Sequence, residues 1–178
     1  QASKGVVSLG GWGGYITVGF DEPIKNTPGK RDFKVLGNAY HSKVNGRDGG
    51  SCEPGIVLVS KDVNGNGLPD DEWYELAGSE YNNPLTVHNY EITYYKPTPL
   101  KADVRWVDNQ GNEGTVNRNI FHKQASYFPV WETKDELVFK GSRLPDNGEK
   151  VNSTFVLFAY DFGYADNQPN DSEGADMD

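Results

Sequence analysis

The sequence contains a single cysteine, Cys52, which excludes an internal disulfide bond and any zinc cage built from cysteines. Its three histidines, His41, His88 and His122, are scattered and share no spacing typical of a zinc enzyme. No GxSxG sequence marks a serine nucleophile, and nothing beside Cys52 would activate its thiol, so we expect Cys52 to be buried. These absences argue against serine, cysteine and zinc hydrolases, and we predict no catalytic residues.

Positive charge is also scarce, with 17 Lys and Arg against 26 Asp and Glu, and the formal net charge is −9. No basic stripe is present to neutralise phosphates, which argues against a nucleic acid partner. The same acidity argues against binding to anionic membrane surfaces. No apolar run approaches the length of a transmembrane helix, so we expect no direct membrane insertion.

Helical periodicity is missing too, because no stretch of eleven or more residues keeps it without a Gly or Pro. Short runs of β-branched and aromatic residues recur instead, bounded by Gly, Pro, Asn or Asp. The runs 56–59 and 155–158 are apolar on both faces, as expected of central strands. The pattern predicts an all-β fold, an antiparallel β-sandwich of jelly-roll type. The expected strands cover 15–20, 33–36, 55–60, 73–76, 90–95, 104–107, 136–139 and 154–160.

The length suits one domain with a substantial core, and the sequence shows no linker and no internal repeat. We therefore predict a single sandwich domain over residues 1–166. Residues 167–178 are polar and acidic, without Lys or Arg and without an apolar run. We interpret them as an acidic tail or as a truncated final segment.

The clearest motif covers residues 62–72, where oxygen-bearing side chains occupy alternate positions before a glycine. Asp62, Asn64 and Asn66 match the first three side-chain ligands of a calcium loop, and Gly67 stands where such a loop turns sharply. The motif predicts Ca²⁺ as the cofactor, in a site that holds a loop and does no chemistry. The predicted ligands are Asp62, Asn64, Asn66, the carbonyl of Leu68, Asp70 and Asp71.

The motif departs from an EF-hand at its last position, where Trp73 replaces the bidentate Glu. Asp71, Glu72 or a residue from elsewhere in the chain could supply the missing carboxylate. The alternative interpretation of the same residues is a polar Asn-Gly turn between two strands.

A second candidate site lies at Trp12, which stands between two pairs of glycines. Glycines leave both faces of the indole open to a flat partner such as a sugar ring or the edge of a corrin. The alternative is a tight turn whose tryptophan caps the sandwich. Aromatic side chains near Asn, Asp and Arg are what carbohydrate recognition needs, and the predicted ligand-binding residues are Trp12, Tyr15, Trp73 and Tyr74.

Several runs together resemble a family of bacterial cell-surface proteins that is common in Bacteroidetes. They are SLGGWGGYITVGFD at 8–21, a block between 23 and 39, EPGIVLVS at 53–60, DVNGNGLPDDEWYELAG at 62–78 and GYADNQPN at 163–170. The resemblance implies a β-sandwich exposed on the outer membrane, which binds a nutrient or a glycan and is joined to other domains of a larger surface lipoprotein. It brings no catalytic residue set. Members of the family continue past the last run, so the resemblance also implies one or two further strands.

Our first hypothesis is therefore an extracellular calcium-binding module that holds a glycan or another small nutrient ligand. One alternative is a surface protein that scavenges cobalamin. A structural or adhesive domain that binds only calcium is another. A glycan-cleaving enzyme with a carboxylate pair that the sequence does not locate is the last, with Glu53, Glu72 and Glu75 best placed near the loop.

Overall fold

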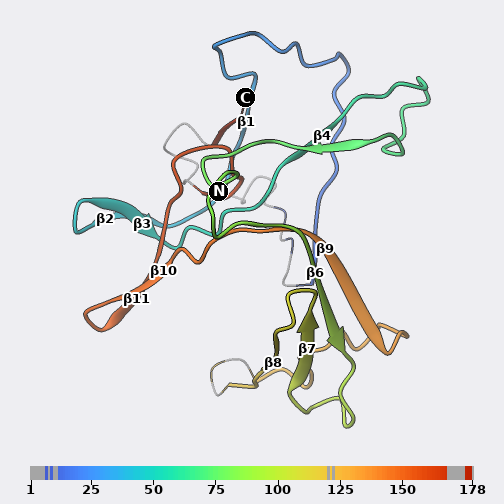
Figure 1. The fold of residues 1–178 in the computed structure, drawn as a ribbon, viewed down its shortest axis with the longest axis vertical. Coiled ribbons are helices and arrows are strands. Elements are labelled where there is room, and N and C mark those ends of the chain that lie inside the picture. The colour runs from blue at the N-terminus through green and yellow to red at the C-terminus, as the bar shows by residue number, and fades with distance from the viewer. Residues whose placement is uncertain are drawn as a thin grey trace, which may run out of the picture. The chain divides into compact units, whose positions relative to one another are not determined.

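The computed structural model describes residues 7, 9, 12–119, 121, 123–167 and 175–177. None of these residues is helical, so they contain no helix that could cross a membrane (Figure 1). The strands they form are β1 (Phe33–Val35), β2 (His41–Val44), β3 (Arg47–Gly50), β4 (Leu58–Ser60), β5 (Trp73–Glu75), β6 (Val87–Tyr95), β7 (Val104–Asp108), β8 (Glu113–Val116), β9 (Glu136–Arg143), β10 (Gly148–Val151), β11 (Thr154–Phe158) and β12 (Ala175–Met177).

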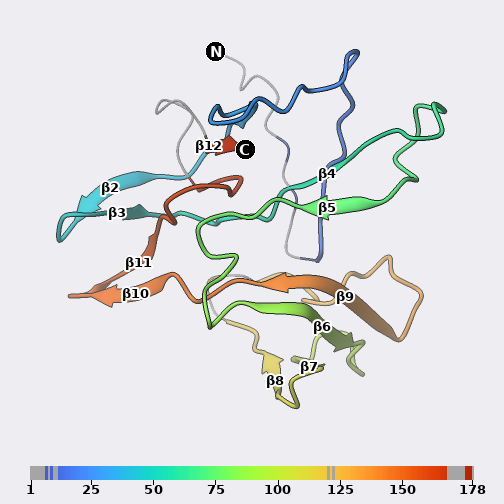
Figure 2. The ribbon, with the colours of Figure 1, turned by 45° about the horizontal axis from the view of Figure 1, so that its top comes forward.

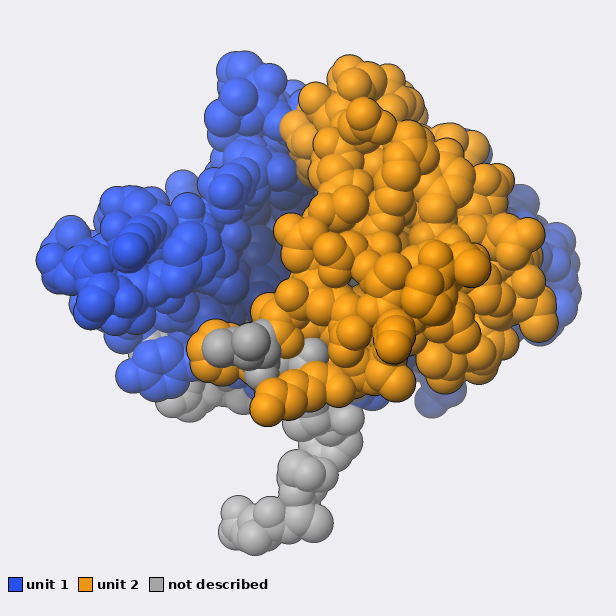
Figure 3. Space-filling model, turned by 90° about the horizontal axis from the view of Figure 1, so that it is seen from below, with its two compact units in different colours: residues 1–86, 144–178 blue, residues 87–143 orange. Residues whose placement is uncertain are grey.

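The chain divides into two compact units, coloured separately in Figure 3. The first unit combines residues 1–86 and 144–178, and the second consists of residues 87–143. The strand pairs are antiparallel throughout both units. The prediction of an all-β fold made of antiparallel sheets is thus confirmed.

The first unit contains a four-stranded sheet in the order β10-β11-β3-β2 and the two-stranded sheets β4-β5 and β1-β12 (Figure 2). The apolar run 155–158 forms most of β11, which lies between two neighbours as predicted, with Val156 and Phe158 buried. The run 56–59 contributes instead to β4, in a sheet of two strands where neither is central. Leu58 is 50% exposed, so an apolar run on both faces fixes neither the burial of its residues nor a strand's place in its sheet.

Sequence runs that lie far apart in the chain meet in the first unit. The amide of Gly55 donates to the carbonyl of Ala165 at 2.8 Å, and the amide of Ala165 donates back at 2.9 Å. Tyr164 is buried, and its hydroxyl accepts a hydrogen bond from the amide of Glu80 at 3.0 Å. Cys52 is buried as expected. Residues 163–167 therefore join the segments near 55 and 80 into one core.

The second unit is a four-stranded sheet in the order β8-β7-β6-β9. An irregularity in the β6–β9 register lies between Val87 and Tyr90, where Asn89 has a φ of 54°. Val104, Phe128 and Pro129 are the buried apolar side chains among the described residues of this unit. Each unit thus has buried side chains of its own.

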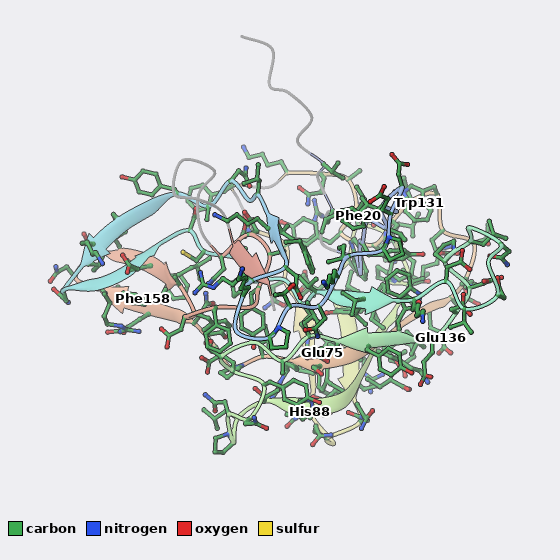
Figure 4. All side chains as sticks on the ribbon, turned by 90° about the horizontal axis from the view of Figure 1, so that it is seen from above. Phe20, Glu75, His88, Trp131, Glu136 and Phe158 are labelled. Atoms are coloured by element: carbon green, nitrogen blue, oxygen red, sulfur yellow. The ribbon has the colours of Figure 1, made fainter. Side chains whose placement is uncertain are left out.

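The expected strand at 15–20 does not form. Its apolar residues Ile16, Val18 and Phe20 are exposed. Phe20, labelled in Figure 4, is 62% exposed. Alternation shows that one face of a segment could be buried, but a strand also needs a partner for its backbone, and the described residues supply none here.

The single sandwich domain over 1–166 and the acidic tail from 167 remain predictions. Residues 168–174 and 178 lie outside the described residues, as do Gly10, Gly11 and His122. Within the predicted tail, 175–177 form β12, which pairs with β1 in the register Phe33–Met177.

Candidate functional site

The predicted calcium loop connects β4 and β5, which form an antiparallel pair in the register Ser60–Trp73. The hydroxyl of Ser60 also donates to the carbonyl of Glu72 at 2.8 Å. Both ends of the loop are therefore held together, so residues 61–72 form a closed connection between two paired strands (Figure 2).

Asp62 organises the first half of the loop. Its Oδ1 accepts hydrogen bonds from the amides of Gly65 at 2.7 Å and Asn66 at 3.1 Å, and its Oδ2 accepts one from Gly67 at 2.9 Å. Gly65 and Gly67 have φ values of 70° and 71°, in the left-handed region that glycine adopts without strain. The backbone of three successive residues therefore bends around the Asp62 carboxylate.

The two asparagines continue this curl. Asn64 Oδ1 accepts from the amide of Asn66 at 2.9 Å, and Asn66 Oδ1 accepts from the amide of Leu68 at 2.8 Å. Their side-chain amides donate to the two carboxylate oxygens of Asp70, at 3.2 Å from Asn64 and 3.0 Å from Asn66. The structure therefore brings the side-chain amide nitrogens of Asn64 and Asn66 into contact with the Asp70 carboxylate.

The sequence left Asp71 and Glu72 as alternatives for the missing carboxylate, and the two side chains have different partners. Asp71 Oδ2 accepts from the amide of Val63 at 3.2 Å, which ties the end of the loop to its start. Glu72 Oε2 accepts from the hydroxyl of Tyr74 at 2.6 Å, and this hydrogen bond raises the pKa of Tyr74. Asp71 is thus the better placed of the two for an ion in the loop.

The donor set of the loop suits a hard cation. Each carboxylate or amide oxygen has more than one lone pair, so an oxygen that accepts one N–H can still coordinate an ion. Within the described part of the chain, no group of three or more His, Cys, Asp or Glu side chains converges as a metal site. An ion here would need amide oxygens and the Leu68 carbonyl beside the aspartates, which are ligands that Ca²⁺ accepts.

Two of the predicted ligand-binding aromatics, Trp73 and Tyr74, do not share a face of their sheet. Trp73 and Tyr74 are 38% and 56% exposed and follow each other on β5, so they point to opposite faces of its sheet. Trp73 Nε1 donates to the carbonyl of Pro69 at 3.4 Å, which places its indole beside the loop. Trp12 is half-buried, and Tyr15 is 84% exposed on the unpaired segment.

Two features were not predicted from the sequence. A cavity of about 320 Å³ opens in the first unit, lined by Gly46, Arg47, Asp48, Ala159, Tyr160 and Asp161. In the second unit, Trp131 is 76% exposed within a turn in which the amide of Glu132 donates to the carbonyl of Pro129 (Figure 4). No motif surrounds either feature, and exposure of a single tryptophan has no sequence signal.

Comparison with known proteins does not assign the chain to a family. No family model matches it, and no curated protein matches it. The resemblance to bacterial cell-surface proteins therefore stays a prediction.

Proposed function

We propose that the chain is an extracellular calcium-binding module of a bacterial cell-surface protein, which holds a glycan or another small nutrient ligand. The carrying observation is Asp62, whose carboxylate accepts three successive loop amides, so that the backbone bends around it. The ion would be held by Asp62, Asn64, Asn66, Leu68, Asp70 and Asp71.

The hydrogen bonds of the loop support calcium because they hold it curled before an ion arrives. Ordering a flexible loop around an ion costs conformational entropy, and here internal hydrogen bonds have already ordered the backbone. Two of the side-chain ligands are neutral amides, and fewer charged ligands mean weaker binding. We expect a dissociation constant of about 10⁻⁴ to 10⁻³ M, the range of extracellular modules.

Trp73 supports a ligand close to the loop. Its indole is partly exposed and is fixed by its hydrogen bond to Pro69, within a loop that the ion would stiffen. A partly exposed indole near carboxylates and amides matches a sugar, which has apolar faces and many hydroxyl groups.

A structural or adhesive domain that binds only calcium is the second candidate. The observation that favours it is that Trp73 and Tyr74 face opposite sides of β5, so they cannot grip one ligand between them. This candidate keeps the calcium loop and omits the small ligand.

Thermal unfolding with and without calcium tests the ion site. At a calcium concentration about 100 times the dissociation constant, binding adds about 2.7 kcal/mol to stability, which is about 5–11 °C in Tm for a chain of this size. Asp62→Ala should abolish this gain, whereas Asp21→Ala, which removes an exposed acid outside the loop, should keep it. An equal gain in Asp62→Ala and the original protein would refute the site.

A second series at fixed calcium tests the ligand. Soluble glycans, their oligosaccharides and cobalamin are added in turn, and a ligand that binds only the folded state raises the Tm. A rise that Trp73→Ala removes while its calcium response persists would support a ligand site beside the loop. A response to calcium alone would favour the structural module.

A further inference from the structure

Four Asn-Gly pairs lie in the described part of the chain: 45–46, 64–65, 66–67 and 147–148. Asn-Gly is the dipeptide most open to spontaneous deamidation, because glycine has no side chain to keep its amide nitrogen away from the asparagine side chain. The four pairs differ in one respect that governs this reaction, which is the partner of the glycine amide.

The reaction needs that amide nitrogen as a nucleophile. The glycine nitrogen attacks Cγ of the preceding asparagine and forms a new N–C bond. The bond from Cγ to Nδ2 breaks, and ammonia leaves with the proton that the backbone nitrogen has lost. Water then opens the resulting cyclic imide, giving either aspartate or isoaspartate.

Three of the four glycine amides donate to a carboxylate. Gly65 and Gly67 donate to Asp62 at 2.7 and 2.9 Å, and Gly148 donates to Asp146 at 2.8 Å. Attack requires the nitrogen to leave this bond and to lose its proton. A nearby negative charge opposes the loss of a proton, so the carboxylate slows the reaction in both ways.

The asparagine side chains of the three held pairs are also engaged. Asn64 and Asn66 are fixed between loop amides and Asp70. Asn147 Nδ2 donates to the carbonyls of Cys52 at 2.9 Å and Phe158 at 2.8 Å. Rotation of these side chains toward the next nitrogen would break those hydrogen bonds.

The pair Asn45–Gly46 has neither restraint. It is the two-residue turn of the β2–β3 hairpin, with φ values of 51° and 79°, and both residues are exposed. Space around Gly46 is open, since a Cβ there would meet no atom within 4 Å. Within the described part of the chain, no acceptor takes the Gly46 amide.

We propose that Asn45 is the site of spontaneous deamidation in this protein, and that Asp62 protects the two Asn-Gly pairs of the 62–72 loop. An isoaspartate at 45 lengthens the backbone of a two-residue turn by one carbon, which opposes the Val44–Arg47 pairing. The inference is independent of calcium, because it rests on hydrogen bonds within the chain.

Peptide mapping by mass spectrometry during incubation at mildly alkaline pH, with chelator present, measures the four rates in one sample. We expect Asn45 to react about tenfold faster than Asn64, Asn66 or Asn147, the factor that a charge-assisted hydrogen bond gives when the transition state must break it. In urea the four rates should converge. Equal rates at Asn45 and in the loop of the folded protein would overturn the proposal.

Two variants form a matched pair for the protecting carboxylates. Asp62→Ala should raise the rates at Asn64 and Asn66 about tenfold and leave Asn147 unchanged. Asp146→Ala should raise the rate at Asn147 and leave the loop unchanged. Unchanged loop rates in Asp62→Ala, or rates raised equally at all four sites as by unfolding, would overturn the protection.

Discussion

Asn167 offers the sharpest test of how the first unit is held together. It is 1% exposed, and its side chain forms two hydrogen bonds with the backbone of Tyr160. Asn167 Oδ1 accepts from the Tyr160 amide at 2.8 Å, and Asn167 Nδ2 donates to the Tyr160 carbonyl at 2.6 Å. Asn167→Ala therefore removes two hydrogen bonds and leaves a backbone donor and a backbone acceptor without their partners.

The expected cost of Asn167→Ala follows from these contacts. Losing both hydrogen bonds and leaving two partly buried groups unpaired should lower the free energy of unfolding by about 2–4 kcal/mol. For a chain of this length that is a fall in Tm of about 5–15 °C by circular dichroism or calorimetry. Asn119→Ala, which removes an exposed side chain that accepts from the Phe121 amide, should change stability by about 0.5 kcal/mol or less.

Asn167→Asp tests the loss of the Nδ2 donor alone, because aspartate has nearly the same size as asparagine. The carboxylate can still accept from the Tyr160 amide, but it faces the Tyr160 carbonyl without a proton to donate. Burial raises the pKa of the new carboxyl group in the folded state, so the variant is most stable at low pH and loses stability as pH rises through that value. Its Tm should approach that of the original protein near pH 4. A deficit independent of pH, or a Tm of Asn167→Ala within 2 °C of the original, would refute this account.

Two further predictions concern the same unit. Burial, with contributions from Glu80, Tyr164 and Asp146, raises the pKa of Tyr160 to about 12. The free energy of unfolding should therefore hold below pH 10 and fall between pH 10 and 12. Tyr160→Phe should lose this fall when unfolding is measured at alkaline pH. Gly78→Ala should be strongly destabilising in thermal melts because its Cβ would lie 2.5–2.8 Å from the Tyr164 ring and hydroxyl, whereas Gly141→Ala, with open space around it, should be nearly neutral.

The class of the fold and the path of the 62–72 loop were predictable from the sequence. Most of the expected runs became strands, because a period of two and β-branched residues act locally. The loop was predictable for the same reason: Asp62 accepts amides only three to five residues ahead, and Asn64 and Asn66 each accept two residues ahead. Such contacts depend on spacing alone.

Strands that form through pairing were missed. β3 has the sequence RDGG, with two glycines and two charges, and becomes a strand because it lies between β2 and β11. The segment 15–20 has the better strand sequence and no partner among the described residues. Local preference contributes little compared with the hydrogen bonds that a neighbouring strand provides or withholds.

The sequence by itself determined an acidic, all-β chain with one curled, oxygen-lined loop, because composition and short spacing are properties of the chain alone. The tertiary structure decided which strands pair, as when β3 pairs with β11. It also decided that Gly55 pairs with Ala165 and that Tyr164 reaches Glu80, 84 residues away. Those partners come together only when distant segments pack, so no spacing in the sequence encodes them.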